Sequence, residues 1–169
     1  MEDEMDTQKK VEFTWSGILS GSGPETQDSI DGSVSIDHWP SSFQTMTLKV
    51  NNFEPQKLGI EIACLYTTPG QQLVEGPYVA NGHVSPPVAT PMDSAYIQAF
   101  KIKLTGDEKE KFTATYSVHA EKTHVDTGAQ EPVGDFAGSD GSWAGFKTTL
   151  PECDVWITKF TINIGAKSR

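Results

Sequence analysis

The sequence predicts an all-β domain of three repeats arranged around a pseudo-threefold axis, as in a β-prism. Two observations support this prediction. Apolar and polar residues alternate along much of the chain, which is typical of strands with one buried face, and one strand pattern occurs three times. Long strands favour the prism, a chain of 169 residues also suits a β-trefoil, and an ordinary β-sandwich or jelly roll is the remaining alternative.

The first strand of each repeat is an alternating segment. Apolar residues alternate with polar ones over 11–15, 60–64 and 112–118. The apolar period of three to four residues that marks a helix is missing, and the charged stretch at 106–111 is only about one helical turn long. We therefore expect half-buried strands, with 106–111 as a hairpin connection.

The last strand of each repeat carries the clearest pattern. Segments 43–50, 97–104 and 157–164 superimpose without a gap, with apolar residues at offsets 0, 3, 5 and 7. These residues are Phe43, Ile97 and Ile157, then Met46, Phe100 and Phe160, then Leu48, Ile102 and Ile162, then Val50, Leu104 and Ile164. The change from a three-residue step to two-residue steps predicts a bulge near the start of each strand.

A turn signal precedes each of these long strands. Asp31-Gly32, Asn81-Gly82 and Asp140-Gly141 are pairs that tolerate positive φ and favour tight turns. Each pair is followed by a proline before the long strand begins. The same order of first strand, variable loop, turn, proline and long strand thus occurs three times.

The repeat sets the expected domain organisation. The three units span about 11–52, 60–105 and 112–165, and hairpin-like links join the end of one unit to the start of the next. They form a single domain over 11–166, behind an acidic and flexible tail over 1–10. The strand at 157–164 is expected to lie near the strand at 11–19, which would close the ring without an open edge.

Composition excludes several classes of partner. The chain has 13 basic and 23 acidic residues, a net charge of −10, and its only arginine is the last residue, Arg169. Such a protein repels polyanions, so nucleic acid is not an expected partner. No apolar run approaches the length of a spanning helix, and the acidic start is unlike a signal peptide. We expect no integral membrane segment, and a protein that is cytoplasmic or released without a classical signal peptide.

Residues that could carry catalysis or bind metal do not form a familiar pattern. Cys64 and Cys153 are expected to be two buried thiols in a reducing compartment, with a single bridge between distant strands as the alternative. His119 and His124 flank Glu121, but their spacing matches no familiar ligand pair, and exposed positions at strand ends explain them. A Gly-x-Ser-x-Gly elbow is absent. The expectation is a protein that is not an enzyme and has no cofactor or metal.

Segment 97–106, with Asn81-Gly82 before it and 116–120 after it, resembles the clostridial hydrophobic-W repeat. That family combines an Asn-Gly or Asp-Gly turn with an alternating final strand, commonly in sets of three units. Segment 140–145 keeps the turn and an Ala-Gly step, whereas the Gly-Trp pair that precedes the turn in the family is absent. The resemblance implies an interaction module for glycans or proteins, without catalytic residues.

Aromatic residues near the turns are the candidate binding residues. Trp15 shares the alternating apolar face of its strand and is expected in the core. Trp39 and Trp143 follow the turns of units one and three, where an aromatic face can accept a sugar ring while nearby polar groups bind its hydroxyls. Unit two offers Tyr78, or Tyr96, in their place. Three similar shallow sites are expected, which carry Asp31, Asn81 and Asp140.

These observations favour a non-enzymatic, lectin-like carbohydrate-binding module with weak sites that gain strength by multivalency, and homo-oligomers are compatible with it. The alternative is a toxin or an assembly subunit that binds protein partners or neutral membranes. A small all-β enzyme is the third hypothesis.

Overall fold

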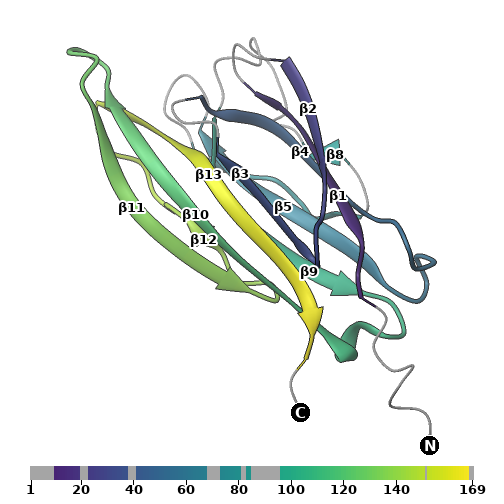
Figure 1. Ribbon diagram of the computed structural model, residues 1–169. Helices are drawn as coiled ribbons and strands as arrows, with labels where there is room; N and C mark the ends of the chain where they lie inside the picture. The colour runs from purple at the N-terminus through teal and green to yellow at the C-terminus, as the bar shows by residue number, and fades with distance from the viewer. Residues whose placement is uncertain are drawn as a thin grey trace, which may run out of the picture.

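A computed structural model describes residues 10–19, 23–37, 41–67, 73–80, 83–84, 96–150 and 152–167. The fold is all-β, as predicted, and its strands form three antiparallel sheets (Figure 1). The strands are β1 Phe13–Leu19, β2 Gly23–Asp28, β3 Ser33–Asp37, β4 Phe43–Val50, β5 Gly59–Thr67, β6 Leu73–Glu75, β7 Val79–Ala80, β8 His83–Val84, β9 Tyr96–Thr105, β10 Phe112–His124, β11 Gln130–Ser139, β12 Ala144–Gly145 and β13 Cys153–Ala166. Within these ranges the one helix is a 3₁₀ turn, Lys109–Lys111. No helix of the described residues is long and apolar enough to cross a membrane.

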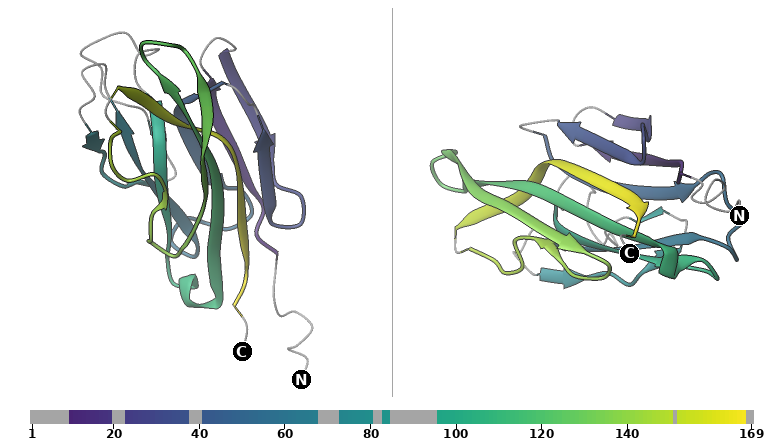
Figure 2. Two further views of the ribbon diagram at one scale, coloured as in Figure 1. Left: turned by 90° about the vertical axis from the view of Figure 1, so that its left-hand side faces the viewer. Right: turned by 60° about the horizontal axis from the view of Figure 1, so that its bottom comes forward.

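Each sheet is centred on the first and last strand of one predicted unit. Sheet I has the order β2-β1-β4-β8, sheet II β6-β5-β9-β12 and sheet III β11-β10-β13-β3, and β7 also pairs with β5. Figure 1 shows sheets I and III on opposite sides of the molecule, and Figure 2 gives two further views of them. The central pairs β1–β4, β5–β9 and β10–β13 are therefore antiparallel partners within a unit, although shorter strands lie between their two members in the chain.

One edge strand of each sheet comes from a different unit. The strand after the turn of unit one, β3, pairs with β13 of sheet III. In the same way β8 pairs with β4 of sheet I, and β12 pairs with β9 of sheet II. Every unit therefore donates one short strand to a neighbouring sheet, which ties the three sheets to one another.

The bulge predicted near the start of each long strand is confirmed in all three sheets. The register shifts between Ile18 and Leu19, between Leu65 and Tyr66, and between His119 and Ala120. In each case the residue at offset 1 of the long strand has no partner in the register with the first strand of its unit. This residue is Gln44, Gln98 or Thr158. All three side chains are buried although they are polar. The bulge lets residues on both sides of it face the core despite the odd spacing.

Aromatic rings from all three sheets meet in the core. Phe43 of sheet I lies 5.2 Å from Phe160 of sheet III, and Phe160 lies 5.6 Å from Phe100 of sheet II, between ring centroids. Trp15 is fully buried against Phe43 and Phe160, which confirms its predicted place in the core. The three sheets therefore share one hydrophobic core.

The links between units differ from the prediction. Segments 51–58 and 106–111 were expected to be hairpins, but each passes from one sheet to the next, because β4 and β9 already have strand partners on both sides. β13 likewise pairs with β10 and β3 and not with β1, so the ring does not close by hydrogen bonding. Contact between the two strands is made by the Trp15 and Phe160 rings, 5.5 Å apart. Of the predicted tail over 1–10, only Lys10 is among the described residues.

Gln98 shows what the polar bulge residue does. Its Nε2 donates to the carbonyl oxygens of Phe146, at 2.9 Å, and of Thr148, at 2.7 Å, and its Oε1 accepts from the Thr67 hydroxyl. These bonds hold the segment after β12 against β9. Gly145 allows the approach, since a Cβ at that position would lie 2.3 Å from the Gln98 carbonyl oxygen.

We predict that Gln98→Leu lowers the free energy of unfolding by about 1–3 kcal/mol, because it removes the bonds to the Phe146 and Thr148 carbonyl oxygens and the acceptor of the buried Thr67 hydroxyl. Gln44→Leu is the matched control. Within the described part of the chain the Nε2 of Gln44 has no hydrogen-bond partner, so its loss should cost less. Urea unfolding monitored by tryptophan fluorescence measures both, and equal losses would contradict this role of Gln98.

Candidate functional site

The structure describes four of the six predicted binding residues. Trp39 and Asn81 lie outside the described residues. Asp31 and Asp140 are exposed and lie in turns, whereas Tyr78 and Trp143 are half-buried. Tyr78 and Trp143 lie together on sheet II, Asp140 is bonded to β10 of sheet III, and Asp31 lies apart in the turn before β3.

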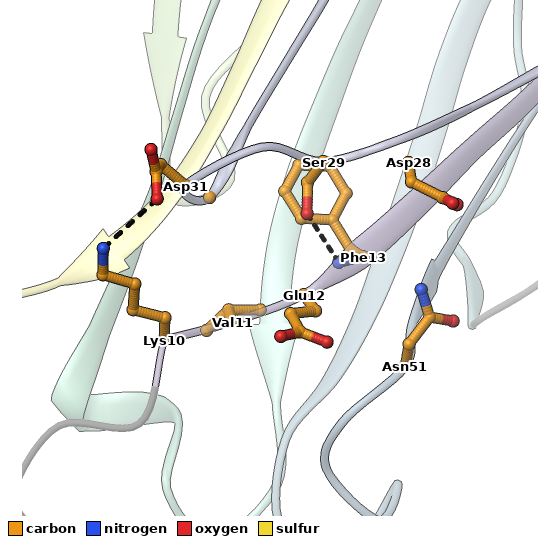
Figure 3. A pocket seen from close by; sticks show the side chains of 9 residues that line it. Lys10, Val11, Glu12, Phe13, Asp28, Ser29, Asp31 and Asn51 are labelled. Atoms are coloured by element: carbon orange, nitrogen blue, oxygen red, sulfur yellow. Dashed lines mark hydrogen bonds and ion pairs between the residues drawn. The ribbon is translucent and has the colours of Figure 1, made fainter.

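Asp31 lies at the rim of a polar hollow between the start of β1 and the turn that leads to β3. The hollow has a volume of about 340 Å³, and its lining includes Lys10, Glu12, Asp28 and Asn51 (Figure 3). The Asp31 carboxylate accepts from the Lys10 ammonium at 3.3 Å. Both groups are well exposed, so this ion pair contributes little to stability.

The Asp140 carboxylate is hydrogen-bonded to β10, in a setting unlike that of Asp31. Its carboxylate accepts from the Ala114 amide at 2.9 Å and from the Thr113 hydroxyl at 2.5 Å. The Ser29 hydroxyl makes the corresponding bond in unit one, to the Phe13 amide at 3.0 Å. Asp140 therefore matches Ser29 in position, and the two Asp-Gly turns are not equivalent in three dimensions.

Tyr78 and Trp143 meet on the outer face of sheet II, although they come from different predicted units. The Lys101 ammonium lies 4.5 Å from the ring centroid of Trp143 and 5.1 Å from that of Tyr78. The Lys103 ammonium lies 4.4 Å from the Tyr78 ring centroid. We refer to Tyr78, Lys101, Lys103 and Trp143 as the aromatic–lysine patch.

Local structure explains this arrangement. Alternation along β9 turns Lys101 and Lys103 outward, while their neighbour Ile102 is fully buried. Trp143 directly precedes β12, whose first residue pairs with Phe100, so its ring is placed beside Lys101. Tyr78 follows β6 and lies close to the turn of unit three, since a Cβ on Gly141 would lie 3.7 Å from the Tyr78 hydroxyl.

Two carboxylates complete the surroundings of the patch. Glu75 lies 3.7 Å from the Lys101 ammonium, and Glu61 lies 3.5 Å from the Lys103 ammonium. Burial, followed by the charges of Tyr116, Glu61 and Glu75, raises the pKa of the Tyr78 phenol. The phenol therefore stays protonated at neutral pH and can donate a hydrogen bond. The patch thus combines two aromatic rings, ammonium and phenol donors, and carboxylate acceptors.

His119 lies in a setting that the sequence interpretation missed. Its Nδ1 is 2.7 Å from an Asp135 carboxylate oxygen, and its Nε2 is 2.5 Å from an oxygen of buried Glu121. Burial lowers the pKa of His119, but the hydrogen bonds and charges of Glu121 and Asp135 outweigh it, so the pKa is raised. The available signal was the two-residue spacing of His119 and Glu121, which places both on one face of a strand.

Neither cysteine forms a disulfide, and both are buried. Among the described residues, no group of three or more His, Cys, Asp or Glu side chains is placed to hold a metal ion.

Comparison with known proteins finds no family model, no curated protein and no solved structure that matches this chain.

We predict that Asp140→Ala destabilises the fold by about 1–3 kcal/mol more than Asp31→Ala, since hydrogen bonds to a charged acceptor are lost at Asp140. The comparison is matched because both residues have positive φ, 42° at Asp140 and 53° at Asp31. Alanine at either position therefore introduces a similar backbone strain. Thermal or urea unfolding of the two variants measures the difference. A larger loss for Asp31→Ala would contradict this assignment.

We also predict that the contribution of His119 to stability depends on pH. Its pKa is higher in the folded state than in the unfolded chain, where it is about 6.5. The stabilisation is therefore complete below the unfolded pKa and is lost as pH rises through the folded pKa. Urea unfolding between pH 5.5 and 9 should show wild type and His119→Gln converging as pH rises. A constant difference across that range would refute the assignment.

Proposed function

We propose that this chain is a non-enzymatic glycan-binding module on a pseudo-threefold, β-prism-like scaffold, and that the aromatic–lysine patch is its binding site. The scaffold part is supported by the common strand order of the three sheets and by bulges at the same offset of β4, β9 and β13. The function rests on one observation, that two half-buried rings from different units converge on the outer face of one sheet.

The chemistry of the patch suits a sugar ring. The apolar C–H face of a pyranose packs on an aromatic face, and its hydroxyls need donors and acceptors at the edge of that face. Trp143 and Tyr78 supply the rings, Lys101 and Lys103 supply donors, and Glu61 and Glu75 supply acceptors.

Geometry limits the affinity of such a site. The Lys101 side chain is only 19% exposed and lies against both rings, so a ligand must share the aromatic faces with an ammonium group. Each cation–π contact at an exposed site is worth about 0.5–1 kcal/mol. Weak binding of single sugars is the consequence, and several copies of the module on one surface would strengthen it.

We predict that a glycan array will show binding that free sugar competes away and that Trp143→Ala abolishes. Trp143→Phe keeps an aromatic face and should retain part of the binding. Ile30→Ala is the control, because Ile30 is an exposed hydrophobic residue, 73% accessible, outside the patch. Leakage of neutral liposomes without any effect of sugar would instead favour the toxin or assembly alternative.

A further inference from the structure

A thiol and an imidazole face each other at one end of sheet III. Cys153 is the first residue of β13, and His124, the last residue of β10, is its partner in the strand register. The Sγ of Cys153 lies 3.4 Å from the Nδ1 of His124. The other ring nitrogen, Nε2, lies 3.8 Å from a carboxylate oxygen of Glu131 on β11.

This order of groups is the one that activates a thiol. The thiolate and not the thiol is the nucleophile, and a neighbouring imidazole favours it by taking the thiol proton. Glu131 then faces the imidazolium that forms and stabilises its charge. The carboxylate is shared with Lys122, whose ammonium lies 3.7 Å away, and Glu131 acts as a positioning residue for the imidazole.

Cys64 provides the contrast within the same chain. It lies in the middle of β5, is 1% exposed, and belongs to the hydrophobic core. Burial raises the pKa of the Cys64 thiol strongly, so its thiolate is not populated at neutral pH.

Cys153 lies close to the molecular surface. It is 6% exposed, but the side chain of its partner His124 is 34% exposed. The adjoining residues, Val125 and Glu152, are exposed turn residues joined by a hydrogen bond between the Val125 amide and the Glu152 carbonyl oxygen. Cys153 therefore lies beside exposed turn residues and outside the core cluster to which Cys64 belongs.

We propose that Cys153, paired with His124, is a thiol–disulfide exchange site for small disulfides of the glutathione type. In the reaction, the Cys153 sulfur attacks one sulfur of glutathione disulfide, and a new S–S bond forms between them. The S–S bond of the reagent breaks, and its electron pair leaves with the second glutathione sulfur, which takes the proton held by His124. The products are a mixed disulfide on Cys153 and one glutathione thiol, so no other oxidant is needed.

The test is incubation of the full chain with glutathione disulfide, followed by alkylation, trypsin digestion and mass spectrometry. Lysines at 57, 101, 147 and 159 place the two cysteines in separate peptides. We expect the mixed disulfide to form on Cys153 at least about tenfold faster than on Cys64 at pH 7. Cys64→Ser should leave the rate at Cys153 unchanged.

The pH dependence separates an activated thiol from a merely accessible one. An ordinary thiol with a pKa of about 8.5 loses nearly all of its thiolate between pH 8 and pH 6, about an 80-fold decrease. We expect the rate at Cys153 to fall less steeply over this range in the wild-type protein than in His124→Gln, because only the wild-type protein has an imidazole 3.4 Å from the sulfur.

Variants then identify the partner. His124→Gln should slow the reaction more at pH 6 than at pH 8, and Glu131→Gln should have a smaller effect in the same direction. Urea unfolding of each variant at the same pH detects a loss of fold that would expose both cysteines. Formation of no adduct, adducts on Cys64 before Cys153, or an unchanged pH profile in His124→Gln would each overturn the proposal.

Discussion

The fold depends on a parity constraint within each long strand. In a regular strand, residues separated by three positions point to opposite faces, so offsets 0 and 3 could not both be buried. The extra residue at offset 1 removes this conflict, and it does so in β4, β9 and β13 alike. Phe43 can then face inward at offset 0 while Phe100 and Phe160 face inward at offset 3. The bulge therefore lets each long strand contribute the residues at both offsets to the shared core.

The bulge residue of β9, Gln98, also links the core to a segment near the surface. A residue in a bulge leaves the strand ladder, and Gln98 uses its freed side chain to bind the backbone after β12. That strand comes from another unit, and it brings Trp143 to Lys101. The buried Gln98 amide therefore helps to hold β12, next to which Trp143 lies, against β9.

Unit three differs from the other two in the length of its strands. β10 has 13 residues and β13 has 14, so their pairing continues well past the bulge. Two polar clusters that contain a histidine lie in this part of the sheet. His119 and its two carboxylates lie at the bulge, and His124 and Cys153 lie at the far end of the pairing. The neighbouring strands provide their partners, because cross-strand pairs bring side chains within contact distance on one face.

The sequence by itself determined the class of fold, which offsets of the long strands are buried, and the position of the bulges. These are local properties, since the two-residue spacing of the apolar residues and its interruption can both be seen within eight consecutive residues. Only the tertiary structure decided which residues meet on the surface. Asp31 and Asp140 look alike in sequence but differ in setting, while Tyr78 and Trp143 belong to different units and yet lie on one sheet. The reason is that one edge strand of each sheet is supplied by another unit, and no pattern within a single repeat encodes that choice.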